Sequence, residues 1–141
     1  MPRILAIDYG QKRTGIAVTD PLQIISTGLK AVDTKDLFSE LETYFRTEDV
    51  ETIVVGYPTT MQNEGAESLV FINPFIEKLI EKYPDKKVVL FDERFTSKLA
   101  QQAILAGGIK KMQRRDKYLT DKISAVIILQ SYMERISNTR I

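Results

Sequence analysis

Histidine and cysteine are both absent from this chain of 141 residues. Their absence excludes Ser-His-Asp and Cys-His catalytic sites, zinc fingers, disulfide frameworks and metal sites built on imidazole or thiolate ligands. Any metal ion must therefore be held by oxygen ligands. Oxygen ligands favour hard ions such as Mg²⁺, Mn²⁺ or Ca²⁺, and they make carboxylates the candidate catalytic groups.

Long apolar runs are also absent. The first run, residues 4–7, is interrupted by Asp8 and is shorter than the roughly 7 to 15 apolar residues of a signal peptide. The longest later run, residues 125–129, is far below the roughly 18 residues that a membrane span needs. We therefore expect a cytoplasmic protein that does not contact a membrane.

The composition is that of a globular protein, with 43% apolar and 28% charged residues. We expect residues 1–141 to form a single domain, because this length suffices for a sizeable core but not for two full lobes. The net charge is only +1, but the charges are unevenly distributed. Residues 33–51 contain seven acids and two bases, a balance of −5, whereas residues 109–141 contain eight bases and three acids, a balance of +5.

Five segments have the composition of β-strands, because they are aliphatic or rich in β-branched residues and are bounded by turn residues. The first two are expected to form a hairpin across a tight connection at residues 10–13. The predicted strands are residues 3–8, 15–19, 24–32, 52–57 and 87–91.

Four segments are predicted to be helical from their apolar period of 3.6 residues and their capping residues. The second either kinks at Pro74 or begins with Asn73 as its cap. The expected bounds are Asp33 or Thr34 to Glu48, 66–83, Thr96 to Gly107–Gly108, and Thr120 or Asp121 to about Ile136.

The order of these segments predicts an α/β fold. Strands 52–57 and 87–91 each follow a helix, so right-handed crossovers make them parallel neighbours, while the opening hairpin supplies antiparallel strands. We predict a mixed five-stranded sheet flanked by helices. Aromatic residues on the apolar stripes of the helices are assigned to the core and not to base stacking: Phe38, Tyr44, Phe45, Phe71 and Phe75.

Acidic residues follow two of the predicted strands. Asp8 ends the first strand, and Asp92 and Glu93 follow the fifth, at the edge where open α/β sheets bind ligands. Adjacent residues on an extended chain point opposite ways, so at most one of Asp92 and Glu93 faces the site. Asp8 could also be a turn former, and Asp121 could be a favourable charge at the start of the last helix.

Convergence of three carboxylates would be electrostatically unfavourable without a cation between them. A divalent ion would resolve this repulsion. Because no histidine is available as a general base, the sequence favours metal ions that generate hydroxide and neutralise a phosphoryl oxygen, as in two-metal phosphodiester hydrolysis.

Basic residues are expected to contact nucleic acid. Lys12 and Arg13 flank the hairpin turn beside Asp8, and Arg94 follows Glu93, so these bases border the predicted acidic site. Ordinary surface charge, or an internal ion pair for Arg94, is the alternative interpretation. The basic end of the chain adds Lys110, Lys111, Arg114, Arg115, Lys117 and Lys122, which could attract phosphates or form a solvated helix surface.

Four motifs occur in order along the chain: DYGQKRTGIAV at residues 8–18, VGYP at 55–58, DERFTS at 92–97 and DKISAVIILQSY at 121–132. They resemble the successive motifs of the YqgF (RuvX) family of small bacterial proteins, known as Holliday junction resolvases and pre-16S rRNA nucleases. The resemblance implies a ribonuclease H-like fold and a metal site at Asp8, Glu93 and Asp121. The loop at residues 59–65 follows the family pattern only loosely.

The resemblance implies a metal-dependent endonuclease acting on structured nucleic acid, with Mg²⁺ or Mn²⁺ as cofactor. It favours 5′-end processing of precursor 16S rRNA in ribosome biogenesis. A Holliday junction resolvase is the enzymatic alternative and would favour a two-fold dimer, whereas we expect a monomer or a weak homodimer. A binding module without catalytic activity is the other alternative, and the retention of all three acids argues against it.

Overall fold

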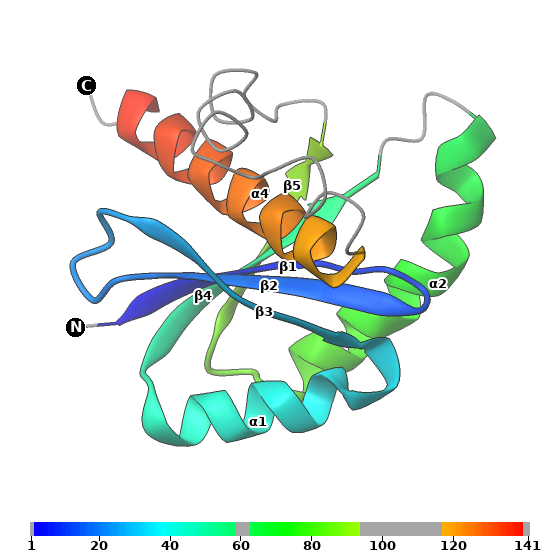
Figure 1. Cartoon of the computed structure of the whole chain (residues 1–141), viewed down its shortest axis with the longest axis horizontal. Helices are drawn as coiled ribbons and strands as arrows, with labels where there is room; N and C mark the ends of the chain where they lie inside the picture. Colours follow the sequence, from blue (N-terminus) through cyan, green and yellow to red (C-terminus); the bar gives the residue numbers. More distant parts are fainter. Residues whose placement is uncertain (1, 59–62, 94–116, 140–141) are drawn as a thin grey trace.

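The chain folds around a mixed five-stranded sheet (Figure 1). The computed structural model describes residues 2–58, 63–93 and 117–139. β1 pairs with β2, and β2 with β3, in antiparallel fashion, whereas β4 is parallel to both β1 and β5. The mixed five-stranded sheet predicted from the sequence is therefore confirmed. In spatial order the strands are β3 (Ser26–Asp33), β2 (Arg13–Thr19), β1 (Arg3–Asp8), β4 (Val50–Tyr57) and β5 (Lys87–Asp92).

The central strand β1 and its parallel neighbour β4 form because their sequences tolerate burial on both faces. Residues 4–7 of β1 and 52–56 of β4 are all buried. Aliphatic and β-branched side chains pack well on a pleated surface that is covered on both sides. β3, at one edge of the sheet, is only partly buried along its length.

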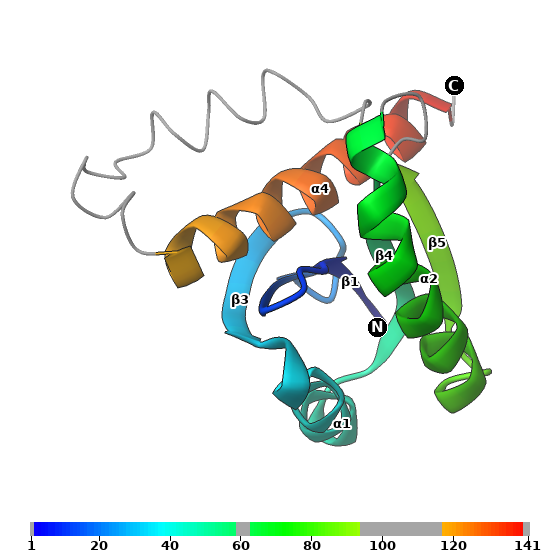
Figure 2. The same ribbon diagram turned by 90° about the vertical axis from the view of Figure 1, so that its right-hand side faces the viewer.

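Helices cover both faces of the sheet (Figure 2). α1 (Leu37–Thr47) and α2 (Asn63–Lys82) pack on one face, and α4 (Lys117–Thr139) crosses the other. None of the described helices combines the length and the hydropathy that crossing a membrane requires.

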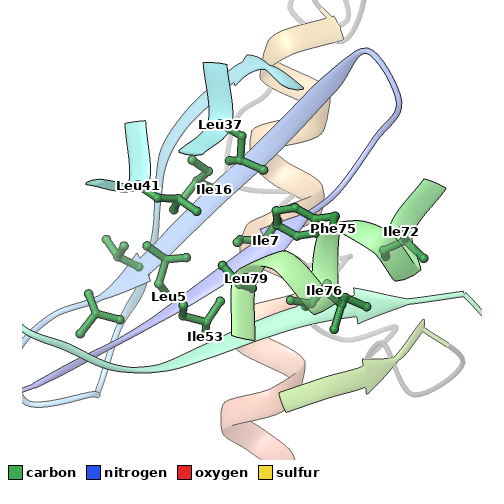
Figure 3. Packing of buried hydrophobic residues seen from close by; sticks show 13 residues of the cluster. Leu5, Ile7, Ile16, Leu37, Leu41, Ile53, Ile72, Phe75, Ile76 and Leu79 are labelled. Atoms are coloured by element: carbon green, nitrogen blue, oxygen red, sulfur yellow. The ribbon is translucent and has the colours of Figure 1, made fainter. Parts of the chain in front are cut away.

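Successive side chains along the strands point to opposite faces of the sheet and contribute to two separate cores. Leu5 and Ile7 of β1 face α1 and α2, whereas Ile4 and Ala6 face α4. Figure 3 shows the first core, to which the helices contribute Leu37, Leu41, Ile72, Phe75, Ile76 and Leu79.

The start of α1 differs from the expectation. Neither Asp33 nor Thr34 caps it, because the 3₁₀ turn η1 (Thr34–Asp36) precedes the helix. The Thr34 hydroxyl instead donates a hydrogen bond to the Gly10 carbonyl oxygen at 2.6 Å. This bond ties the β1–β2 turn to the beginning of the helical segment.

The second helix also starts earlier than expected. α2 begins at Asn63 and contains Pro74 in its interior, so the alternative start at Asn73 is wrong. Residues 63–65, expected in a loop, are helical. The helix expected after Thr96 lies outside the described residues.

α4 begins at Lys117, which places Asp121 in its second turn and not at its N-terminus. The favourable effect of a helix dipole on a carboxylate is largely confined to the first turn. The dipole is therefore a weak explanation for the presence of Asp121.

α4 approaches the sheet closely because glycines lie beneath it. A Cβ atom on Gly15 of β2 would overlap the backbone carbonyl group of Asp121. A Cβ atom on Gly56 of β4 would stand 2.6 Å from Cδ1 of Ile128. The backbone of α4 thus rests directly on β2, and any side chain at position 15 would push it away.

We expect Gly15→Ala to lower the free energy of unfolding by roughly 1–3 kcal/mol, as overpacking does, because the backbone of α4 must move. Gly28→Ala in β3 is the matched control. Its Cβ atom would meet only side-chain atoms, Cγ and Cδ of Lys122 at 2.7 and 3.0 Å and Cγ2 of Val126 at 3.3 Å, so the backbone of α4 need not move as it must for Gly15→Ala. Urea unfolding monitored by circular dichroism measures both, and equal losses in the two variants would contradict this account.

Candidate active site

Asp8 lies where the central strand β1 ends. Ala6 faces α4, so the alternation of side chains along the strand directs Asp8 to the same face of the sheet. Gly15 of β2 pairs with Asp8, and Gly56 of β4 lies one residue beyond the partner of Ile7. Asp8 is therefore flanked by two glycines, which leave room above it for groups from α4 and β5.

Asp121 reaches this position through α4. Its backbone lies on Gly15, the residue that pairs with Asp8. Its carboxylate accepts a hydrogen bond from Nε of Arg13 at 2.9 Å, with both side chains about one quarter exposed. The Arg13 guanidinium carbon also lies 5.9 Å from the ring centroid of Tyr118 on α4. Arg13 thus attaches the start of β2 to the first two turns of α4.

Glu93 is the carboxylate of the Asp92–Glu93 pair that lies on the face of Asp8. Phe91 packs in the core beneath α4, and alternation brings Glu93 to the same face and Asp92 to the opposite one. Oε1 of Glu93 lies 3.3 Å from the position that a Cβ atom of Gly56 would occupy. Burial, and then the charge of Asp92, raises the pKa of Glu93.

The three carboxylates interact electrostatically. Burial, and then the negative charges of Glu93 and Asp121, raise the pKa of Asp8 from 3.8 to about 7. A hydrogen bond with the Ser124 hydroxyl lowers it. That hydroxyl also donates to the Thr120 carbonyl oxygen at 3.0 Å, so its single proton serves one acceptor at a time. Burial is the largest cause of this rise in the pKa of Asp8, and the two neighbouring carboxylates add to it.

The donor set suits a hard divalent cation. Asp8, Glu93 and Asp121 offer carboxylate oxygens, which Mg²⁺ and Mn²⁺ prefer. Within the described ranges, however, no three acidic side chains are close enough together to form a ready-made metal cage. Arg13 holds Oδ2 of Asp121, so this ion pair does not involve the other carboxylate oxygen, Oδ1. The residues fit such an ion by their chemistry, and coordination by all three carboxylates would require side chains to move closer together.

A cleft of about 240 Å³ opens at the same edge of the sheet. It lies outside the carboxyl ends of the parallel strands β1 and β4, where open α/β sheets bind ligands. Glu93 belongs both to the acidic group and to the wall of this cleft. The lining residues are Tyr9, Gly10, Gln11, Gly56, Pro58, Phe71, Ile72 and Glu93.

The basic residues selected from the sequence have different positions. Lys12 is exposed in the β1–β2 turn, near the end of β1. Arg13 is ion-paired with Asp121, an interaction that sequence reasoning did not anticipate. Lys117 and Lys122 lie in α4, and the others lie outside the described residues: Arg94, Lys110, Lys111, Arg114 and Arg115.

One aromatic residue was assigned wrongly. Phe75 is buried, and Phe38, Tyr44 and Phe45 pack half-buried against the same core, as expected. Phe71 is instead 44% exposed and lines the cleft. The phase of α2 could have indicated this, because the buried residues centre on Phe75 and Leu79 and leave Phe71 at the edge of the apolar stripe.

The raised pKa of Asp8 predicts a pH-dependent stability. Between pH 3.8 and about 7 the folded protein holds a proton at Asp8 that the unfolded chain has released, so the free energy of unfolding falls as the pH rises. In EDTA, Asp8→Asn should match the parent in melting temperature below about pH 4 and exceed it by a few degrees above pH 7. Glu81→Gln, at an exposed position of α2, should show no such pH-dependent difference in melting temperature from the parent. Equal melting temperatures of the parent and Asp8→Asn at pH 8 would show that the fold does not disfavour the ionised form of Asp8.

Comparison with known proteins identifies relatives along nearly the whole chain. Residues 2–135 match the family model described as RuvX, Holliday junction resolvase. A protein from Porphyromonas gingivalis, named “Putative pre-16S rRNA nuclease”, is 54% identical over 134 residues, which are 95% of this chain and 97% of the relative. A protein of the same name from Phocaeicola vulgatus is 55% identical over 134 residues, 95% of this chain and 96% of the relative.

The fold has a counterpart among solved structures. T. thermophilus RuvC, solved in complex with a Holliday junction substrate, superimposes with a TM-score of 0.56 at 17% sequence identity, covering 93% of this chain and 92% of RuvC. This similarity confirms the predicted ribonuclease H-like fold. Since the family model spans nearly all of the sequence and two relatives are more than half identical to it, this protein belongs to the RuvX family.

Proposed function

We propose that this protein is a metal-dependent endonuclease that hydrolyses phosphodiester bonds in structured nucleic acid, with precursor 16S rRNA as its substrate. The main support is the position of Asp8, which lies within electrostatic range of Glu93 and Asp121 beside an open cleft. The name of the two relatives, at 54% and 55% identity, supports the choice of precursor 16S rRNA. We propose that the protein acts in the processing of its 5′ end. We further propose that residues 1–141 act as one domain in the cytoplasm.

Asp8, Glu93 and Asp121 would hold Mg²⁺ or Mn²⁺. When bound, the ion supplies Lewis-acid activation of water and neutralises charge at the phosphoryl oxygen. Without a cation, Asp8 is protonated in a large fraction of molecules near neutral pH, because its pKa is about 7. Metal binding must displace that proton, so we expect metal affinity to rise with pH through this range.

Other residues of the chain would position the substrate. Lys12 at the β1–β2 turn can neutralise a phosphate that enters the cleft beside Asp8. Arg13 is a positioning residue for Asp121, because its Nε binds that carboxylate. Gly10 and Gln11, which precede Lys12 in the β1–β2 turn, line the cleft and can contact the sugar-phosphate chain.

A Holliday junction resolvase is the second candidate function. It is favoured by the description of the family model and by the fold that the chain shares with RuvC. Symmetric cleavage of a junction favours a dimer with two-fold symmetry. We propose a monomer or weak homodimer, which suits a substrate without that symmetry.

A cleavage assay tests the function directly. Labelled precursor 16S rRNA fragments and four-way DNA junctions are incubated with the protein in Mg²⁺, Mn²⁺ or EDTA. We expect cleavage of the rRNA fragment with either metal and none in EDTA. Asp8→Asn and Glu93→Gln should each lose at least a hundredfold in turnover, because each removes a charged metal ligand.

Asp92→Asn is the matched control, since it removes the neighbouring carboxylate that alternation directs to the opposite face. It should retain most of the turnover. Full activity of Asp8→Asn, or of the parent in EDTA, would refute the metal-dependent nuclease. Preferential cleavage of the junction would favour the resolvase.

The basic segment at residues 110–122 is proposed to bind substrate phosphates. Neutralising a phosphate releases counterions, with a salt slope of roughly 0.7 to 0.9 per contact. Replacing both Arg114 and Arg115 by Ala should weaken binding to all sequences about equally and flatten the salt dependence by up to about two contacts. Dissociation constants across a KCl series, with thermal melting as the folding control, measure this. Unchanged slopes would show that the segment is only a solvated surface.

A further inference from the structure

A second cleft lies between α1 and α2 and adjoins the first. Its volume is about 250 Å³. Tyr9 and Phe71 line both clefts, so the two meet at these rings. We call the second cleft the α1–α2 groove. Its lining residues are Tyr9, Thr34, Leu37, Phe38, Phe71, Pro74, Phe75 and Lys78.

Aromatic rings that pack against one another line the groove. Tyr9 stacks on Phe75, with ring centroids 4.3 Å apart and an interplanar angle of 14°. Phe38 packs against the same ring, with centroids 5.5 Å apart and an interplanar angle of 47°. Phe75 itself is buried, whereas Phe71 at the junction of the two clefts is 44% exposed. The groove therefore presents an exposed ring beside others that are fixed by packing.

Two lysines of α2 lie close to the Phe38 ring, which lines the groove. Nζ of Lys78 lies 5.1 Å and Nζ of Lys82 lies 5.3 Å from the centroid of the Phe38 ring. Spacings of seven and four residues place Phe71, Lys78 and Lys82 along one face of α2. Glu77 and Glu81 are exposed on a different face of the helix. Lys78, which lines the groove, and Lys82, one turn further along α2, therefore follow the Phe71 ring on the same face of the helix.

Exposed aromatic rings next to cations are the two elements with which proteins bind single-stranded nucleic acid. The ring stacks on a base and the cations hold the backbone. We propose that the α1–α2 groove binds an unpaired nucleotide next to the cleaved phosphodiester, with its base on Phe71 and its phosphate at Lys78, the strand continuing toward Lys82. This proposal rests on the proposed nuclease function, because it treats the first cleft as the place of cleavage.

The proposal has a consequence for substrate choice. A base inside a duplex is already stacked on its neighbours and cannot cover the Phe71 ring, whereas an unpaired base can. The groove therefore favours substrates in which a single-stranded segment adjoins the cleaved bond. A fully paired helix would gain only the contacts to the lysines.

Binding without cleavage tests the groove. In EDTA, fluorescence anisotropy gives dissociation constants for a labelled eight-nucleotide oligouridine and for a blunt RNA hairpin with the same number of phosphates. Phe71→Ala should weaken oligouridine binding roughly tenfold, from the loss of one stacked base, and Lys78→Gln should weaken it several-fold. The hairpin should be almost unaffected by Phe71→Ala.

Matched variants separate the groove from general effects. Phe71→Trp keeps an aromatic ring and should retain oligouridine binding. Val70→Ala removes an adjacent, exposed apolar side chain on another face of α2 and should change nothing. Lys87→Gln removes one positive charge at the opposite end of the sheet and should also change nothing. Thermal melting confirms that each variant is folded.

An abasic oligonucleotide of eight residues separates stacking from charge. It keeps the phosphates but has no bases, so Phe71→Ala should have no effect on its binding while Lys78→Gln still weakens it. Equal oligouridine affinities for the parent and Phe71→Ala would overturn the proposal. Equal losses of affinity for the oligouridine and the hairpin would show that the groove binds a duplex backbone. That result would also overturn the proposal.

These outcomes are distinct from those of the cleavage assay. If Phe71→Ala leaves binding intact while Asp8→Asn abolishes cleavage, the nuclease function stands and the groove proposal fails. If no cleavage occurs with any metal but oligouridine binding depends on Phe71 as expected, the groove is a single-strand binding site and the nuclease function fails.

Discussion

The close approach of α4 to the sheet determines both the fold of this face and the geometry of the acidic group. It depends on Gly15 and Gly56, which flank Asp8 on the neighbouring strands and have no side chain to hold the helix away. Because the backbone of α4 rests on Gly15, Asp121 and Ser124 come within electrostatic and hydrogen-bonding range of Asp8. A larger residue in either strand would separate the carboxylates and loosen the core between the sheet and α4.

The same approach creates an electrostatic conflict within the folded chain. Burial near Glu93 and Asp121 makes the ionised form of Asp8 unfavourable, which explains why its pKa rises so far. The ion pair between Arg13 and Asp121 offsets part of the negative charge. Two apolar cores, one on each face of the sheet, supply the stability that lets the fold tolerate the charge repulsion that remains. Strongly perturbed carboxyl groups next to a cleft are typical of functional sites.

The edge of the sheet beyond β1 and β4 joins two chemically different surfaces. Glu93 marks the acidic end, on the α4 side, and the rings of Tyr9 and Phe71 lead from there to the α2 side. Tyr9 follows Asp8 directly, and alternation along β1 directs the two side chains to opposite faces of the sheet. One dipeptide therefore contributes both to the acidic group and to the aromatic groove.

The sequence by itself determined the strands, their parallel and antiparallel relations, and the position of Asp8 at a sheet edge. These features follow from apolar periodicity, turn residues and crossover handedness, which depend mainly on residues close together in the sequence. Tertiary structure decided what depends on distant partners. Thr34 bonds to Gly10 and does not cap α1, and Arg13 binds Asp121, 108 residues away. Glu93 rather than Asp92 lies on the face of Asp8, because packing fixes which face of β5 lies under α4. Long-range packing selects among orientations that local sequence leaves equally available, and so it decided these details.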